Sequence, residues 1–154
     1  MRDSRSFWSV LWSQPPGPHS RLSRYIVANG LLYMAIGASI YLAPSSVLEQ
    51  ALFLPPLTPL EQGLLRALGS VAAILGWFYV MGGRTRAASF CLATVVDRLL
   101  VPLLFVPLWV LGLGPAGLVF PFAILDPVLA IGAYVIWRRE VASPDASTGT
   151  TVQA

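Results

Sequence analysis

The chain has no lysine, and among its 154 residues it has one cysteine and one histidine. Cys91 alone cannot close a disulfide within the chain, and Cys91 with His19 cannot supply the three or four ligands of a zinc site. No partner base accompanies Cys91, so we interpret it as a small buried packing residue rather than a nucleophile. Redox and zinc chemistry on these residues are therefore not expected.

Charge of either sign is also scarce. Charged residues make up 11% of the chain and hydrophobic residues 56%, and the mean hydropathy is +0.70. These values lie outside the usage of soluble globular domains and within that of membrane proteins. The arginines stand mainly in pairs beside apolar segments, where membrane topology explains them. We therefore expect a lipid bilayer as the surrounding medium and no nucleic acid partner.

Motifs that carry catalysis or hold cofactors are missing. The sequence has no phosphate-binding G-x-x-x-x-G-K-[ST], no H-E-x-x-H and no G-x-S-x-G. The spacing G-x-G-x-x-G does occur, at Gly112, Gly114 and Gly117, but it lies between two long apolar segments and not after a strand, as the dinucleotide-binding motif requires. No histidine falls within an apolar segment to ligate a haem. We therefore predict no cofactor and no metal, assign no catalytic residue, and favour a protein that is not an enzyme.

Four apolar segments predict four transmembrane helices within a membrane domain covering 25–140. Their expected bounds are 25–42, 64–81, 88–111 and 118–137. The shortest would measure roughly 27 Å at the helical rise, close to the ~30 Å hydrocarbon thickness. The fold class is therefore predicted to be an all-α membrane protein with four spans in an antiparallel bundle. Prolines in the third and fourth spans predict kinks there.

The segments outside the spans have their own expected roles. Residues 1–24 are expected to be cytoplasmic, with an aromatic cluster for the membrane interface that precedes a proline-rich break. We do not interpret this segment as a cleaved signal peptide. The connection between the first two spans is expected to follow the membrane surface, with a short helix over Leu48–Leu54. Residues 141–154 are expected to be a disordered cytoplasmic tail.

The distribution of arginine predicts the topology. Four arginines precede the first span, two lie between the second and third, two follow the fourth, and the other two connections have none. Arginine near the end of a span is retained on the cytoplasmic side. Both termini are therefore expected to be cytoplasmic, in a multi-pass protein of the plasma (inner) membrane.

Four charged residues lie within or at the edge of these apolar segments: Arg66, Asp97, Arg98 and Asp126. The topology brings both aspartates near mid-membrane, roughly 12 to 14 Å deep by the helical rise. Each such group costs about 2.5 to 3.5 kcal/mol at a helix centre, so we expect these charges to face the interior and compensate one another. Arg98 could pair with Asp126, and Arg66 could either cap the cluster or extend to the headgroups.

Two interpretations of this polar centre stay open. In one, the charges form an ionic lock that fixes the register of the helices and has no other role. In the other, one carboxylate stays partly unpaired and binds a proton or the polar end of a ligand. The sequence does not choose between them.

Small and polar residues elsewhere outline the same interior. On the first span, residues recur every four positions and form one ridge: Tyr25, Asn29, Tyr33, Gly37 and Tyr41. We expect Asn29 and Tyr33 to face protein and support the polar centre. Tyr134 is expected to do the same from the inner side of the fourth span, together with Ala130 and Ala133. On the second span, the spacing of Gly69 with Ala73, and of Ala72 with Gly76, predicts close helix packing.

The four-span layout, the Arg66-Ala67-Leu68-Gly69 start of the second span and the basic Gly82-Gly83-Arg84 turn resemble the small bacterial membrane proteins grouped around DoxX. The resemblance covers about Tyr25 to Trp137. It implies a plasma-membrane protein without its own cofactor, sometimes the membrane partner of a quinone-linked oxidoreductase. It assigns no role to Asp97, Arg98 or Asp126.

These observations predict an accessory subunit or a binder of a small amphiphile. One alternative is a small membrane enzyme that acts on a lipid or isoprenoid through an intramembrane aspartate. Another is a proton-coupled carrier that acts as a dimer. A partner membrane protein, an oxidoreductase among them, and a homodimer are both open expectations.

Overall fold

The computed structural model describes residues 20–43 and 45–142, and in that part the chain is all-helical, without strands. The predicted aromatic cluster before residue 20 and most of the predicted disordered tail lie outside the described residues. The helices are α2 (Arg21–Leu42), α3 (Ser45–Ala51), α4 (Pro59–Arg84), α5 (Ala88–Val110) and α6 (Ala116–Ala142). The four long helices correspond to the four predicted spans. The predicted short helix over Leu48–Leu54 is present as α3, which begins and ends three residues earlier.

Two of the long helices, α2 and α4, start earlier than predicted because polar residues cap their first turns. The side chain of Ser20 accepts a hydrogen bond from the amide of Ser23, so α2 starts at Arg21 rather than at Tyr25. Thr58 and Glu61 form a reciprocal capping box, which starts α4 five residues before the predicted Leu64. A hydropathy pattern detects the apolar interior of a helix but not such polar first turns.

Each of the four long helices is long and apolar enough to cross a membrane. Large apolar side chains are exposed along all of them, for example Leu31 on α2, Val71 on α4, Leu103 on α5 and Ile131 on α6. Such continuous apolar exposure is typical of helices that face lipid rather than water. The chain is therefore built as a multi-pass membrane protein.

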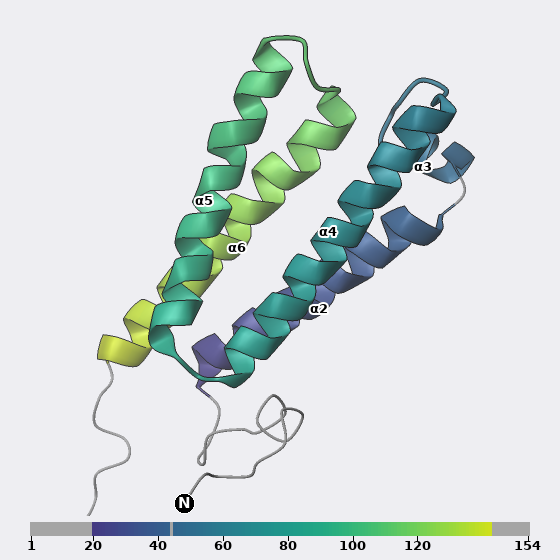
Figure 1. Ribbon diagram of the computed structural model, residues 1–154. Coiled ribbons are helices and arrows are strands. Elements are labelled where there is room, and N and C mark those ends of the chain that lie inside the picture. Colours follow the sequence, from purple (N-terminus) through teal and green to yellow (C-terminus); the bar gives the residue numbers. More distant parts are fainter. Residues whose placement is uncertain (1–19, 44, 143–154) are drawn as a thin grey trace, which may run out of the picture.

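The long helices form two pairs, α2 with α4 and α5 with α6 (Figure 1). Contacts between the two pairs are far fewer than contacts within each pair. The pairs lie together at the end where α2 starts, α4 leads into α5, and α6 finishes, which we call the termini end. They diverge toward the opposite end, which carries α3 and the α5–α6 connection and which we call the α3 end. The antiparallel bundle predicted from the sequence would place the second and third spans side by side across their short basic turn. In the structure α4 and α5 make few contacts.

Glycine lets α2 and α4 approach almost backbone to backbone. A Cβ on Gly30 would lie 2.6 Å from the carbonyl oxygen of Gly76, and one on Gly69 would lie 2.8 Å from that of Gly37. Real side chains do not tolerate such distances from backbone atoms. The small-residue spacing of the second span therefore predicted a real close contact, and it lies within the chain rather than between copies.

The interior proline residues do not end their helices. Pro102 and Pro107 lie within α5, and Pro121 and Pro127 lie within α6. Each lacks the amide hydrogen that would bond the carbonyl of the residue four positions earlier, so each leaves one carbonyl free of the helical ladder. For Pro102 that carbonyl belongs to Arg98.

Candidate functional site

A small set of buried polar residues lies where the two helix pairs meet. Asn29, Arg98 and Asp126 are at most 4% exposed, and Tyr33 and Tyr79 are buried beside them. These residues come from α2, α4, α5 and α6, so each long helix contributes. We call this set, together with Asp97, the polar centre.

Asp126 is held by a tyrosine rather than by an arginine. Its carboxylate accepts a hydrogen bond from the hydroxyl of Tyr33 on α2, and both residues are buried. This contact joins the two helix pairs. The ridge of α2 that was predicted to face protein does so at Asn29, Tyr33 and Gly37, whereas Tyr41 is 51% exposed.

Asp97 has a similar partner but a different setting. Its carboxylate accepts a hydrogen bond from the hydroxyl of Tyr79 on α4. Unlike Asp126, Asp97 is exposed at the surface of the chain. The prediction that all the spanning charges face the interior is therefore wrong for Asp97, because α4 and α5 touch too little to cover it.

Arg98 is completely buried, at 0% exposed. Its guanidinium carbon lies 5.5 Å from the ring centre of Tyr33 and 4.8 Å from that of Tyr79, so the two rings flank it. None of its three side-chain nitrogens has a hydrogen-bond partner among the described residues. A bidentate pair of Arg98 with Asp126, which the sequence left open, is therefore not formed.

The energies show that this arginine is under-compensated. A desolvated cation–π contact contributes about 2 kcal/mol. Burying an ion costs several kcal/mol even after the surroundings relax, and its unmade hydrogen bonds add to that cost. Asn29, one helical turn before Tyr33 on α2, adds one more unsatisfied donor, since its buried amide nitrogen also lacks a hydrogen-bond partner. The polar centre thus presents buried donors that no described acceptor satisfies.

Arg66 does not belong to the polar centre. It is exposed on α4, 13 residues before Tyr79, which corresponds to about 20 Å along the helix axis. It therefore does not cap the cluster, which was one of its two predicted roles. Without Arg66, the polar centre contains two carboxylates and one guanidinium, a formal charge of −1. The four charges sum to zero in the sequence, but only three of them lie in the polar centre.

Tyr134 also lies outside. It is 46% exposed and its ring packs against Trp137, with ring centres 5.7 Å apart. Its neighbours Ala130 and Ala133 are buried with Asp126, as predicted. Ala133 therefore lies on the inward face of α6, and Tyr134, the next residue, lies outside that face.

Tyr79 is the residue that the sequence did not reveal. The buried face of α4 contains Gly69, Ala72, Gly76 and Tyr79, spaced by three and four residues. Extending the small-residue ridge by one more step would have placed Tyr79 on this face. Tyr79 and Tyr33 also contact each other edge to face, with ring centres 5.8 Å apart. Cys91 is 2% exposed, which confirms its predicted packing position.

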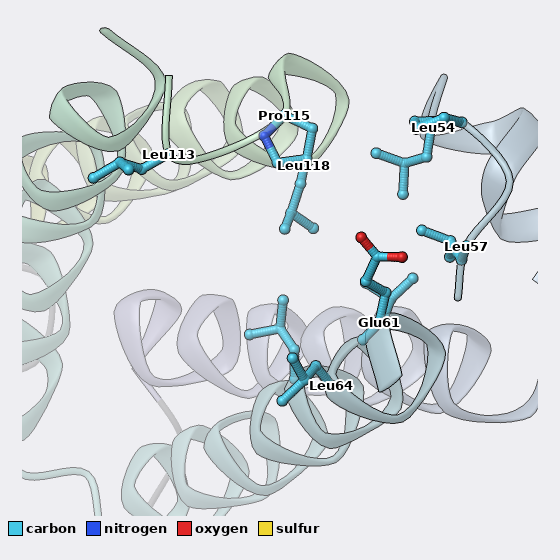
Figure 2. Close-up of a pocket in the computed structure, with 10 residues that line it drawn as sticks. Leu54, Leu57, Glu61, Leu64, Leu113, Pro115 and Leu118 are labelled. Atoms are coloured by element: carbon cyan, nitrogen blue, oxygen red, sulfur yellow. The ribbon is translucent and has the colours of Figure 1, made fainter. Parts of the chain in front are cut away.

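Three apolar cavities lie at the α3 end, where the helix pairs diverge. The largest, about 510 Å³, lies between the start of α4 and the start of α6 and is lined mostly by leucine (Figure 2). Glu61 is its one acidic lining residue, and the carboxylate of Glu61 is already bonded to Thr58. The second cavity, about 480 Å³, lies between Ala51 and Phe53 and the first turns of α6.

The third cavity is lined by residues that are close in sequence to the polar centre. It has a volume of about 390 Å³ and is lined by residues of α2, α3 and α6. Its lining includes Ile36, one helical turn beyond Tyr33, and Leu125, which directly precedes Asp126. The polar centre therefore begins about one turn, ~5 Å, from the lining of an apolar cavity.

This arrangement defines a class of protein: an all-helical chain with four helices able to cross a membrane and a buried polar centre beside apolar cavities. Within the described residues no cluster of histidine, cysteine and acidic side chains could hold a metal ion. No family model matches the chain, and no curated protein or solved structure matches it.

Proposed function

We propose that this chain binds a small amphiphile inside the membrane, with the polar end of that molecule at Arg98 and Asn29 and its apolar end in the cavity beside Ile36. The observation that carries the proposal is the buried guanidinium of Arg98, whose three nitrogens have no hydrogen-bond partner. A head group with acceptor oxygens would supply the missing partners. The adjacent cavity of about 390 Å³ falls within the ~300–1,000 Å³ range of small-molecule sites.

The proposed setting is a plasma membrane that the chain spans four times as an antiparallel bundle, with both termini cytoplasmic. The register of the contacts supports opposite directions for α2 and α4, since Gly30 lies beside Gly76 and Gly37 beside Gly69. The arginines support the cytoplasmic termini. Kinship with the DoxX-like proteins, and with it a role as an accessory subunit, rests on the layout of the sequence.

The ionic-lock interpretation predicts a different outcome for the same residue. Removing one partner of a buried ion pair costs about 3–5 kcal/mol, because the other charge is left uncompensated. An arginine without a hydrogen-bonded partner leaves no such broken pair when an apolar side chain replaces it. Because Arg98 has no hydrogen-bonded partner, we expect Arg98→Met to fold as well as the wild type. It should nevertheless lose the amphiphile.

The test is native mass spectrometry of the chain purified in mild detergent, for the wild type, Arg98→Met and the matched control Arg66→Met. We expect the wild type and Arg66→Met to carry the same small amphiphile, and Arg98→Met to be folded but empty. An unliganded wild-type chain would contradict the proposal. So would an Arg98→Met variant that retains the same molecule.

The enzyme alternative receives less support from the geometry. Each intramembrane aspartate already accepts a hydrogen bond from a tyrosine hydroxyl, Asp126 from Tyr33 and Asp97 from Tyr79. The buried donors of Arg98 and Asn29 have no partner, so a ligand would displace no existing hydrogen bond there. Binding is therefore the function that we propose.

A further inference from the structure

The exposed carboxylate of Asp97 is the second unusual feature of the polar centre. Asp97 lies nine residues from the start of α5, about 14 Å along the helix and therefore near mid-span. Its neighbours on the helix surface are apolar and exposed, with Val96 60% and Leu100 46% exposed. A carboxylate in such a surface would face hydrocarbon, with the hydroxyl of Tyr79 as its hydrogen-bond donor.

The charge balance points in the same direction. The polar centre contains two carboxylates and the guanidinium of Arg98, so its formal charge is −1. Asp126 is 2% exposed and cannot be reached from outside, whereas Asp97 can. A positive charge arriving from outside the chain would therefore meet Asp97.

We propose that a helix of another membrane protein docks on the Asp97 face of α5 and places an arginine or lysine of its own beside Asp97. The face consists of Ala93, Asp97, Leu100 and Leu104, which recur every three or four residues and are all exposed. The apolar members would pack against the partner helix, and Asp97 would form the ion pair that fixes its depth. Charged pairs of this kind are how ionisable groups are accommodated within membranes.

A second copy of this chain does not fit the same face. A symmetric contact would bring Asp97 against Asp97 and add like charges. The other copy's Arg98 is buried, and Arg66, which is exposed, lies about 20 Å along the axis from the level of Asp97. The complementary charge must therefore come from a different protein.

This inference rests on the proposed four-span arrangement but not on the bound amphiphile. The test uses the full chain in lipid vesicles, with synthetic polyleucine helices as partners and association measured by energy transfer between attached dyes. One peptide carries a single central arginine, a second has leucine there, and a third has the arginine moved two turns toward one end. Vesicle flotation confirms insertion beforehand, so that failure of the membrane arrangement is recognised separately.

We expect the peptide with the central arginine to associate at least about tenfold more tightly than the other two. Asp97→Asn should abolish that difference and Asp97→Glu should restore most of it, whereas Glu61→Gln, a change at the α3 end, should preserve it. Equal association of all three peptides with the wild type would overturn the proposal, even if the Asp97 variants failed to insert. Preferential binding of the central-arginine peptide by an inserted Asp97→Asn chain would do the same.

Discussion

The interface between α2 and α4 differs in composition from the interface between the two helix pairs. Between α2 and α4, glycine residues such as Gly30 and Gly76 bring two backbones into contact. Between the α2/α4 pair and the α5/α6 pair, contacts are fewer. They combine the tyrosine, aspartate and arginine of the polar centre with an apolar cluster that includes Ile26, Cys91 and Ala133. The first interface is closely packed. The second adjoins cavities and contains hydrogen-bond donors without partners. The first interface therefore holds its two helices tightly together, and the second is the place where we propose that a ligand binds.

The largest effect is expected when the glycine interface is broken. In Gly76→Leu, the new Cβ would lie 2.5 Å from the carbonyl oxygen of Gly30, and backbone cannot move aside as a side chain can. We expect a loss of stability at or beyond the upper end of the ~1–3 kcal/mol seen for overpacking. Chemical denaturation in detergent micelles measures it. The matched control is Gly63→Leu, where nothing lies within 4 Å of the added Cβ, and it should unfold like the wild type.

A smaller effect is expected when the polar interface loses one hydrogen bond. Tyr33→Phe removes the donor to Asp126 and leaves a carboxylate that is 2% exposed. The expected cost is about 1–3 kcal/mol in the free energy of unfolding, the range for an unsatisfied buried group. Tyr41→Phe is the comparison, because Tyr41 is 51% exposed. Equal stabilities of the two variants would show that the Tyr33–Asp126 contact does not join the pairs.

The start of α4 should be sensitive to a lesser degree. The hydroxyl of Thr58 accepts a hydrogen bond from the amide of Glu61, and the amide of Thr58 donates one to the carboxylate of Glu61. Thr58→Ala should lower stability by about 1 kcal/mol, the usual cost of losing an N-cap. Thr58→Ser keeps the hydroxyl and should retain most of the stability in the same denaturation assay.

The smallest effect is expected at Tyr134, which the sequence suggested as a supporting residue of the polar centre. Its exposed ring packs on Trp137 and no described hydrogen bond involves its hydroxyl. Tyr134→Phe should change the free energy of unfolding by less than about 0.5 kcal/mol. It should also leave bound amphiphile in place, and a loss of ligand would return Tyr134 to the site.

The sequence predicted the four long helices and the close packing of the second, because apolar length and small-residue spacing are local properties. It did not predict that the first helix is the partner in that packing. It did not predict the partners within the polar centre. Helices that are apolar on all sides do not reveal which face points inward, so Asp97 could not be separated from Asp126, nor Ala133 from Tyr134. The separation of about 20 Å between Arg66 and the polar centre depends on how α4 is aligned with α5, which no local pattern encodes.

The most direct test of the account measures distances between spin labels in a Cys91→Ala background. Leu60 on α4 with Leu111 after α5 reports on the separation of the two pairs, and Leu60 with Leu42 reports on the α2/α4 pair; all three positions are well exposed. If an amphiphile lies between the pairs, stripping it with detergent should change the first distance and leave the second unchanged. If both distances stay the same, or both change together, the account is contradicted.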